Sequence, residues 1–269
     1  MEWSKEAATA IKKVPFFVRK RVKARVEEEA ARQGDNVVTL KHVKACQQRF
    51  LNKMEEEVKG YQVETCFGPS GCPNRAVETE GLADKLQALL DQKGLKDFLK
   101  TVVGGPLKLH HEFRVSISDC PNACSKPQIA DVGLIGALRP VVSDESCSHC
   151  QACVDACKES AIELTEDGPI IDFDKCLYCG SCIRECPTAT LAEGESGYRI
   201  LVGGKLGRHP RLAQDLGKIF HEDSIPSVLS RIVDLYKAHC KRGERLGAII
   251  ENKGIETFAR EIKNPNLLI

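Results

Sequence analysis

Two cysteine runs dominate the sequence: Cys147-Ser-His-Cys-Gln-Ala-Cys-Val-Asp-Ala-Cys157 and Cys176-Leu-Tyr-Cys-Gly-Ser-Cys-Ile-Arg-Glu-Cys-Pro187. In each run, two residues separate the first three cysteines from one another, and three residues precede the fourth. Spacing this short allows a tight loop to direct three thiolates at one metal centre. Structural zinc takes four ligands in a single shell, so the doubled pattern disfavours zinc and favours two iron–sulfur clusters.

The two runs resemble a bacterial two-cluster ferredoxin, in which the fourth cysteine of each run binds the other cluster. This resemblance implies one [4Fe–4S] cluster on a first set, Cys147, Cys150, Cys153 and Cys186. It implies a second cluster on a second set, Cys176, Cys179, Cys182 and Cys157. The first run has Lys158 in place of the usual proline, which removes no ligand. We therefore expect a ferredoxin insert at residues 146–192.

Four further cysteines form two pairs ahead of the insert, and we call them the third set: Cys66, Cys72, Cys120 and Cys124. Four thiolates in two pairs can hold either one more [4Fe–4S] cluster or a zinc ion, and spacing alone does not decide between them. Disulfides are disfavoured in a reducing compartment, so grouped cysteines in a cytoplasmic chain indicate metal ligands. Cys46 and Cys240 stand alone, and we expect both to be buried or inert thiols.

The sequence around the later cysteine pair carries a second resemblance. Glu112-Phe-Arg-Val-Ser-Ile-Ser-Asp-Cys-Pro-Asn-Ala-Cys-Ser-Lys-Pro127, followed by Ala130-Asp-Val-Gly-Leu-Ile-Gly136, resembles the siroheme sulfite and nitrite reductases. Their pattern is Cys-x5-Cys, a long gap, Cys-Pro-Asn-x-Cys and then Asp-x-Gly-x-x-Gly. Gly203-Gly-Lys-x-Gly-Arg208 resembles the ending of their cofactor domain. With its inserted ferredoxin, the chain is similar over residues 61–265 to anaerobic sulfite reductase catalytic subunits and small dissimilatory-type relatives.

The family resemblance implies that the third set holds a [4Fe–4S] cluster and that Cys124 bridges it to the siroheme iron. A porphyrinoid with many carboxylates needs cationic and backbone donors. The candidate cations are Arg75, Arg114, Lys126, Lys205, Arg208 and Arg211. Each of them is equally consistent with an ordinary solvated role. Arg114 and Lys126 are also candidate catalytic residues, and His111 is a candidate proton donor.

One pair of positions departs from the family pattern. Sulfite reductases resemble one another in a Lys-x-Lys pair that binds the anionic substrate, and Glu112 and Arg114 stand at the corresponding positions. Arg114 keeps a planar cation suited to an oxyanion. Residues two apart lie on one face of a strand, so we expect Glu112 to face the iron and to repel sulfite. The alternative is that Glu112 points away and pairs with a base such as Lys108.

Residues 1–58 are predicted to form a separate helical domain. Ser4 and Thr39 are expected to cap helices, and Pro15 opens a helix that Gly34 ends. This segment resembles the helical tail of a light-independent protochlorophyllide reductase subunit. The matching residues are Trp3, Val14-Pro-Phe-Phe-Val-Arg19, Glu28, Ala30-Arg-x-x-Gly34 and Val38-Thr39.

The overall prediction is an α+β protein in which a siroheme half-domain, residues 59–145 and 193–269, is interrupted by the ferredoxin insert. We expect a helix over Leu82–Leu99 that breaks at Gly94, and mostly amphipathic helix from Ser224 to Glu261. Strands are expected at Phe113–Ser118, Ile129–Leu138 and Tyr198–Val202.

Composition limits the cellular locations and the binding partners that are expected for the chain. Of its 269 residues, 29% are charged, and no apolar run approaches the length of a membrane span. The first residues lack a hydrophobic stretch, so we expect a cytoplasmic protein. Residues 1–60 carry 14 Lys/Arg against 9 Asp/Glu, whereas residues 144–193 carry 3 against 11. This uneven charge argues against nucleic-acid binding and suits a basic electron-donor protein.

These features predict an anaerobic enzyme that reduces sulfite to sulfide, with nitrite as the second candidate substrate. The resemblance implies that electrons pass from the ferredoxin clusters through the third cluster to siroheme. A non-catalytic electron carrier, a siroheme-free subunit and a tetrapyrrole-handling protein remain alternatives. The family builds its siroheme site from two pseudo-symmetric halves and this chain holds one, so we expect a homodimer or a larger even oligomer.

Overall fold

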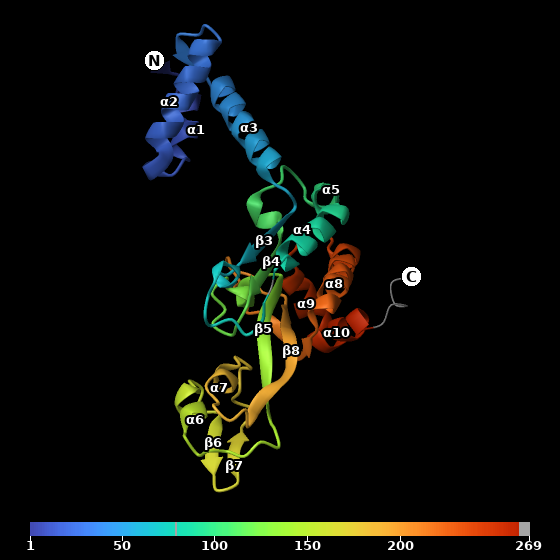
Figure 1. The fold of residues 1–269 in the computed structure, drawn as a ribbon. Helices are drawn as coiled ribbons and strands as arrows, with labels where there is room; N and C mark the ends of the chain where they lie inside the picture. Colours follow the sequence, from blue (N-terminus) through green and yellow to red (C-terminus); the bar gives the residue numbers. More distant parts are fainter. Residues whose placement is uncertain (79, 264–269) are drawn as a thin grey trace. The chain divides into compact units, whose positions relative to one another are not determined.

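A computed structural model describes residues 1–78 and 80–263. The chain forms two compact units, which are described separately (Figure 1). The helical unit comprises Met1–Val58 and Gly105–His110, and the sheet unit comprises Lys59–Gly104 and the chain from His111 onward. Residue 79 of the expected range 59–145 and residues 264–269 of the range 193–269 lie outside the described residues.

The helical unit contains α1 (Lys5–Lys12), α2 (Phe16–Arg32) and α3 (Leu40–Glu57). The Ser4 hydroxyl accepts a hydrogen bond from the Ala7 N–H at 3.2 Å, and Thr39 begins α3 in a capping box with His42. Gly34 follows α2 with a φ of +78°, so the predicted helix boundaries are confirmed. A short parallel pair, β1 (Glu2–Trp3) with β2 (Val37–Val38), was not anticipated.

The sheet unit is built on five strands in the order β3-β4-β5-β8-β9. They are β3 (Tyr61–Thr65), β4 (Phe113–Ser118), β5 (Val132–Val142), β8 (Leu191–Val202) and β9 (Gln214–Phe220). The first three run parallel, and β8 and β9 are antiparallel to their neighbours. The strand predicted at Phe113–Ser118 is confirmed. The strand predicted within Ile129–Leu138 is present as β5, which begins at Val132 and extends to Val142, and the strand predicted at Tyr198–Val202 is the end of the longer β8. β3 and β9 were not anticipated.

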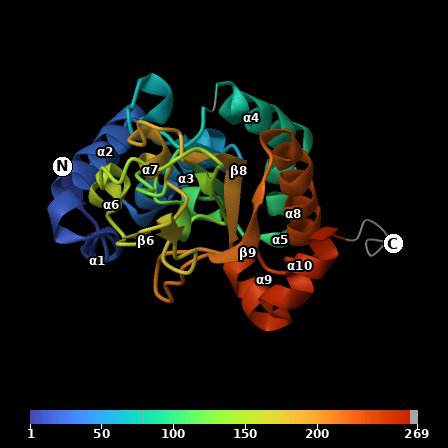
Figure 2. The ribbon, with the colours of Figure 1, turned by 60° about the horizontal axis from the view of Figure 1, so that its bottom comes forward.

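Five helices cover one face of this sheet (Figures 1 and 2). They are α4 (Leu82–Gln92), α5 (Leu95–Val102), α8 (Ile225–His239), α9 (Leu246–Lys253) and α10 (Ile255–Lys263). Gly94 separates α4 from α5 with a φ of +59°, as predicted. Within the described parts of the chain, no helix is long and apolar enough to cross a membrane.

The two faces of β4 have different chemistry because successive side chains alternate across a strand. Phe113, Val115 and Ile117 point into the apolar core beneath the helices. The alternate residues of the strand, Arg114 and the serines 116 and 118, line the opposite face. The described residues also contain four short 3-10 helices: η1 (Gly68–Ser70), η2 (Leu109–His111), η3 (Pro127–Ile129) and η4 (Glu222–Ser224).

Residues 143–190 form an insert between β5 and β8, beyond the ends of these two strands (Figure 1). It contains α6 (Ala152–Ala156), the antiparallel hairpin of β6 (Ile162–Thr165) and β7 (Gly168–Ile171), and α7 (Ser181–Arg184). The Leu138 N–H donates to the Tyr178 carbonyl oxygen at 2.7 Å, which ties the insert to β5. The mixture of helices and an open sheet confirms the α+β class.

Candidate iron–sulfur and siroheme site

The third set of cysteines converges at the carboxyl ends of two neighbouring parallel strands. Cys66 directly follows β3, and Cys120 comes shortly after β4. The Cys66 N–H donates to the Ile117 carbonyl oxygen at 2.9 Å, which extends the pairing of the strands by one residue. Because neighbouring parallel strands end at the same edge of a sheet, these two cysteines lie together there. Cys72 and Cys124 follow on the next turns of the chain.

The sulfurs of the third set are close enough to affect one another's ionisation. Burial raises the pKa of the Cys120 thiol, and the neighbouring Cys66, Cys124 and Cys72 raise it further through charge repulsion. The N–H groups of Gly68 and Asp119 donate to the Cys66 sulfur at 3.2 and 3.3 Å. Donors directed at sulfur favour the thiolate, which is the form that binds a metal.

Cys124 differs from the rest of its set in exposure. Cys120 is buried, Cys66 and Cys72 are half-buried, and Cys124 is exposed. A buried thiolate can serve only a cofactor inside the site, whereas an exposed one is also accessible to a second metal centre. Cys124 is therefore the member of the third set best placed to bridge two cofactors.

The loop that carries Cys124 is held in a strained backbone conformation. Ala123 and Lys126 have φ angles of +53° and +61°, in the left-handed region that non-glycine residues rarely adopt. The hydroxyl of Ser125 donates to the Ile117 carbonyl oxygen at 2.7 Å, and further hydrogen bonds link Ser125 to serine hydroxyls of β4. Strand β4 thus fixes the position of Cys124 against the local preference of the loop.

Two glycines of β5 allow the cysteine loop to approach the sheet. A Cβ atom on Gly133 would lie 2.3 Å from the Pro127 carbonyl oxygen, and one on Gly136 would lie 2.3 Å from the Asp119 carbonyl oxygen. Both distances are far below van der Waals contact. The glycines of the Asp-x-Gly-x-x-Gly pattern therefore meet a packing requirement of this loop.

In the insert, the structure brings the four cysteines of the first set together. Burial raises the pKa of the Cys153 thiol, and the nearby Cys186 and Cys147 raise it further. The N–H of Ala152 donates to the Cys150 sulfur and lowers the pKa of that thiol, and Cys186 lies close enough to oppose this effect. Cys186, from the second run, thus lies among three cysteines of the first run.

The second set shows the reciprocal exchange. Burial raises the pKa of the Cys182 thiol to about 12, and the neighbouring Cys176, Cys179 and Cys157 contribute to the rise. The Ala161 N–H donates to the Cys157 sulfur at 3.2 Å. Cys157 therefore joins the second run, and the grouping is the one that the ferredoxin resemblance implies.

The spacing of the three sets bears on which cofactor fits them. Among residues 1–78 and 80–263, no group of three or more His, Cys, Asp or Glu side chains is arranged to hold a metal ion. A [4Fe–4S] cluster binds its thiolates at separate irons, so they stand further apart than the ligands of one zinc ion.

A cavity of about 120 Å³ separates the third set from the second. Cys120 lies on its wall, together with all four members of the second set: Cys157, Cys176, Cys179 and Cys182. The Arg184 guanidinium donates to the Arg75 carbonyl oxygen at 3.3 Å and so joins the two cysteine-bearing regions. Of the two sets in the insert, the second is thus the neighbour of the third.

Arg114, Lys126 and Arg208 are the candidate cations with the most capacity to bind an anion. Arg114 is half-buried, and its Nε atom is buried without a hydrogen-bond partner in the described part of the chain. A buried donor without a partner is costly, so this atom fits the binding of an additional anionic group. Lys126 and Arg208 are exposed.

The remaining candidates are partly engaged in holding the fold. Arg75 forms an ion pair with Glu78 at 3.0 Å. Arg211 donates to the Gly247 carbonyl oxygen at 3.1 Å, and its backbone exchanges two hydrogen bonds with Lys205. His111 is half-buried in η2. These contacts leave Arg75 and Arg211 less able to turn toward a cofactor.

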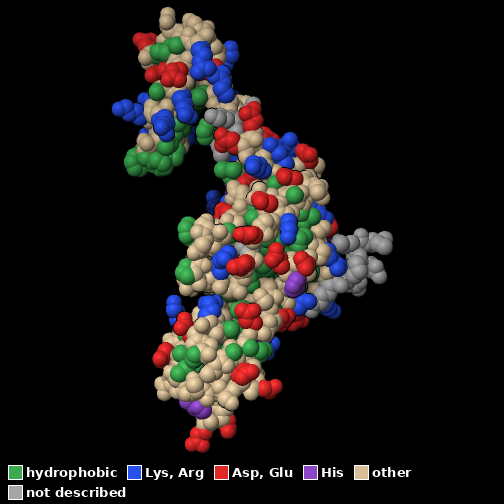
Figure 3. Space-filling model, viewed as in Figure 1, with side chains coloured by type: hydrophobic (Ala, Val, Ile, Leu, Met, Phe, Trp, Pro, Cys, Tyr) green, Lys and Arg blue, Asp and Glu red, His purple; other side chains and the backbone are tan. Residues whose placement is uncertain are grey.

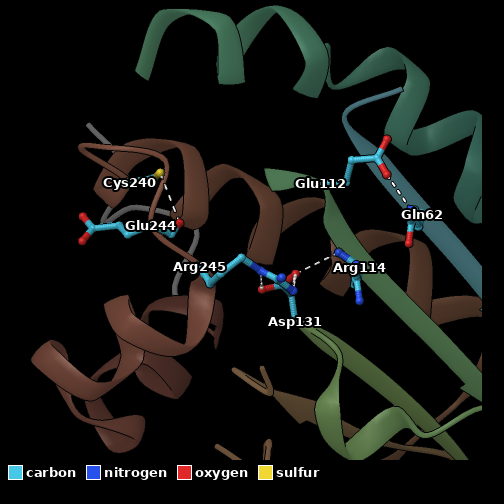
Figure 4. Close-up of polar contacts among 7 residues, drawn as sticks. All are labelled: Gln62, Glu112, Arg114, Asp131, Cys240, Glu244 and Arg245. Atoms are coloured by element: carbon cyan, nitrogen blue, oxygen red, sulfur yellow. Dashed lines mark hydrogen bonds and ion pairs between the residues drawn. The ribbon is translucent and has the colours of Figure 1, made fainter. Parts of the chain in front are cut away.

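The expectation that Glu112 faces the substrate is wrong (Figure 4). Glu112 is buried, and its Oε1 accepts hydrogen bonds from the N–H groups of Lys59 at 2.8 Å and Gly60 at 3.3 Å. Its Oε2 accepts one from the Gln62 side-chain amide at 2.6 Å. The carboxylate thus accepts hydrogen bonds from the backbone and side chain of the segment that enters β3, as it would if it pointed away from the substrate.

Sequence reasoning missed a buried ion pair beside Arg114 (Figure 4). The fully buried Asp131 carboxylate accepts from the Arg245 guanidinium at 3.0 and 2.5 Å and from the Arg114 backbone N–H at 2.8 Å. Burial lowers the pKa of Arg245, but the charge of Asp131 and its hydrogen bonds to the guanidinium together outweigh burial and raise the pKa. A lone acid within an apolar strand was the available signal, because such a charge needs a partner.

The two isolated cysteines lie apart from the three sets. Cys240 is buried, as expected, and its thiol donates to the Glu244 carbonyl oxygen at 3.4 Å (Figure 4). Cys46 is half-buried in α3. Burial raises the pKa of both thiols, which makes them poor nucleophiles and poor metal ligands.

With this geometry established, comparisons with known proteins assign the family. Residues 59–266 match the model of the nitrite and sulphite reductase 4Fe-4S domain. The chain belongs to this family. The recognition made from the cysteine motifs is thereby confirmed, and with it membership of a family of oxidoreductases that bind iron–sulfur clusters. Residues 3–47 separately match the model of the proto-chlorophyllide reductase 57 kD subunit.

Several known proteins are similar to this chain. The coenzyme F420-dependent sulfite reductase of Methanocaldococcus jannaschii is 36% identical over 155 residues, which cover 57% of this chain and 25% of that protein. A subunit of the anaerobic sulfite reductase of Salmonella typhimurium is 28% identical over 150 residues, which cover 50% of this chain and 40% of that protein. The chain thus spans between a quarter and somewhat over half of the curated relatives that it matches.

A solved structure supports the fold. The crystal structure of dissimilatory sulfite reductase I matches with a TM-score of 0.53 and 19% sequence identity, covering 81% of this chain and 57% of that one. At this identity, the likeness concerns the fold alone.

Proposed function

We propose that this chain reduces sulfite to sulfide on siroheme, with electrons supplied through three [4Fe–4S] clusters. Family membership supports sulfite or nitrite reduction in general. The observation that carries the specific proposal is that Cys124 alone is exposed in a set of four convergent cysteines. An electron carrier without siroheme has no need for an exposed ligand at that position.

The cofactors are assigned to the cysteine sets and cations already described. Each set holds one [4Fe–4S] cluster, and Cys124 also binds the siroheme iron. When bound, siroheme supplies an iron at which an oxyanion can be reduced. The cations proposed to hold its carboxylates are Arg75, Arg114, Lys126, Lys205, Arg208 and Arg211. The unpartnered Nε of Arg114 supports this assignment more directly than any other contact.

Three side chains are proposed to act on the substrate. Arg114 and Lys126 offset the negative charge of sulfite or nitrite, and the planar guanidinium suits the paired oxygens of either anion. His111 is proposed to supply protons to the oxygen that leaves as water, because an imidazole is a common general acid in enzymes. Glu112 takes no part in this chemistry because donors around β3 occupy its carboxylate.

The spatial arrangement of the cysteine sets supports a direction for electron flow. The second set shares a cavity wall with Cys120 of the third, so we propose that electrons leave the insert through the second set. The first set then receives electrons from the donor protein and passes them to the second. This order needs no movement of the insert, because Leu138 and Tyr178 are joined by a backbone hydrogen bond.

The domain organisation follows as a proposal. Residues 1–58 form the helical domain, residues 59–145 and 193–269 the siroheme half-domain, and residues 146–192 the ferredoxin insert. We propose an anaerobic cytoplasmic setting, because many free thiols and exposed clusters require a reducing compartment. Nucleic acid is not among the proposed partners.

The test is an absorption spectrum and a metal analysis of protein purified without oxygen. We expect siroheme bands, iron for three clusters, and oxidation of reduced methyl viologen that depends on sulfite. Nitrite is assayed in parallel to rank the two substrates. Iron without a tetrapyrrole, in an inactive protein, would support the electron-carrier alternative instead.

A substitution tests the bridging ligand separately. Cys124→Ser should lose sulfite reduction and the electronic coupling of siroheme to the third cluster, while the insert clusters remain visible by electron paramagnetic resonance. Cys46→Ser is the matched control and should keep native activity, because Cys46 lies outside all three sets. Full activity of the Cys124 variant would show that the bridge is assigned wrongly.

A further inference from the structure

An apolar surface stays exposed where the insert joins the end of β5. We call it the docking patch, and it consists of Val141, Val142, Ile170 and Phe173. Val142 and Ile170 are 53% and 58% exposed. The four side chains line one shallow hollow where the end of β5 meets β7. Contiguous exposed apolar groups on a small domain usually mark a contact surface for another molecule.

Acidic side chains surround the docking patch. Glu195 lines the same hollow, and Glu193 and Asp174 are exposed beside it in the chain. Basic side chains are also present: Arg139 lines the same hollow, 4.4 Å from the Phe173 ring centre, Lys175 pairs with Asp172 at 3.0 Å, and Arg199 and Lys218 line the adjoining hollow. The acidic excess therefore comes from the insert as a whole, in which residues 144–193 carry 3 Lys/Arg against 11 Asp/Glu. Figure 3 shows acidic and apolar side chains together on the insert. An apolar centre with an acidic rim is complementary to a basic partner.

The docking patch borders both cysteine sets of the insert. Val142 pairs with Leu191, whose N–H donates to the Cys186 sulfur of the first set at 3.4 Å. At the other end, Phe173 lines a second hollow together with Cys176 of the second set. A protein seated on the patch therefore comes within a few residues of either set.

We propose that the docking patch is the surface on which a basic redox protein exchanges electrons with the insert. The inference rests on the proposed cluster assignment and names its partner surface. One electron passes from the donor's redox centre to an insert cluster, so that the donor is oxidised and the cluster reduced. No bond is formed and no proton moves. The acidic rim steers the encounter, and the apolar centre excludes water from the contact.

Cytochrome c, a small basic one-electron protein, is a suitable probe of the reverse transfer. The full chain is reduced, freed of reductant and mixed with ferricytochrome c, and the formation of ferrous haem is followed by stopped flow. Ile170→Lys and Val142→Lys each remove an apolar contact and add a charge that repels the probe. Val37→Lys is the matched control, because Val37 is also an exposed strand residue but lies in the helical unit. Ferricyanide, which needs no protein contact, serves as the second oxidant.

We expect each patch variant to lower the second-order rate constant with cytochrome c by about tenfold or more at low salt. The Val37 variant should match the native protein, and ferricyanide should oxidise all four proteins alike. Native rates with cytochrome c in both patch variants would overturn the docking proposal. Iron content and electron paramagnetic resonance are measured first on each protein. Absence of clusters in the native chain would refute the proposed function itself, whereas intact clusters with unchanged rates would refute only the docking surface.

Discussion

The Glu112 carboxylate accepts hydrogen bonds from donors around β3. A substitution of Glu112 by lysine is therefore expected to destabilise the fold and not to raise sulfite turnover. Glu112→Lys would leave the N–H groups of Lys59 and Gly60 without an acceptor and bury a cation in their place. We expect a loss of about 3 kcal/mol in the free energy of unfolding and no gain in sulfite turnover. Denaturant unfolding and the viologen assay measure the two effects.

Glu64→Lys provides the matched control for that substitution. Glu64 lies on β3 and is exposed, so the same charge change should leave stability within about 0.5 kcal/mol of native. A Glu112 variant that is as stable as the control, with faster sulfite reduction, would restore a substrate-facing role for this carboxylate.

Asp131 is the second residue whose charge decides local stability. Asp131→Asn would leave the Arg245 guanidinium without its counter-charge near the start of α9. Breaking a buried pair by removing one partner costs about 3 kcal/mol or more, whereas replacing both partners with apolar groups is often close to neutral. We therefore expect the double variant Asp131→Leu with Arg245→Met to be more stable than Asp131→Asn in denaturant unfolding. A double variant that is less stable would show that the ion pair itself stabilises the fold.

At the scale of elements, the loop from Cys120 to Pro127 depends on Ser125. Ser125→Ala removes the hydroxyl that donates to the Ile117 carbonyl oxygen and frees a loop with two left-handed residues to relax. We expect siroheme content per chain to fall severalfold, while the insert clusters are retained. Absorption and electron paramagnetic resonance measure the two quantities. Ser227→Ala, which removes an exposed helix-end hydrogen bond, should change neither; equal siroheme loss in both variants would contradict the role of the loop.

Elements with strong local signals could be predicted from the sequence, and those that depend on distant partners could not. Ser4, Thr39 and Gly94 set helix boundaries through local hydrogen bonds or backbone freedom, and all three boundaries were correct. Strand β9 has few buried side chains and contains Gly217, so its pairing with β8 gives almost no signal in the sequence. The mostly helical stretch expected from Ser224 to Glu261 is confirmed as three helices, and the sequence did not predict the turns that separate them, between Cys240 and Arg245 and again at Gly254.

In the candidate site too, local features could be predicted from the sequence, whereas contacts with distant residues could not. Cysteine spacing indicated the two runs of the insert because short-range geometry constrains them, whereas the assignment of the third set rested on the family resemblance. The role of Glu112 was wrong because alternation along a strand says nothing about donors arriving from β3. The Asp131–Arg245 pair joins residues 114 positions apart, and the sequence contains no local sign of which base it selects.

At the scale of the whole molecule, we propose that the chain supplies one half of a siroheme site and needs a second half to close it. The described residues form a single five-stranded sheet, and one group of four cysteines, the third set, lies at its edge. Arg208 and Lys126 are exposed, as expected if another protein surface covers them and completes the siroheme site. A second copy related by two-fold symmetry would supply that surface without another gene product.

We therefore predict a homodimer, or a larger even oligomer, in which residues of one protomer approach the siroheme of its partner. Light scattering on the anaerobic protein should give a mass that is an even multiple of the chain's. Mixing two inactive variants tests the shared site: if Arg208 acts across the interface, protomers with Cys124→Ser and Arg208→Ala recombine to give one intact site per mixed dimer. Activity should then return to a fraction of native, whereas two copies of either variant remain inactive. A strictly monomeric and fully active protein would refute the prediction, because one half-domain would then suffice to close the siroheme site.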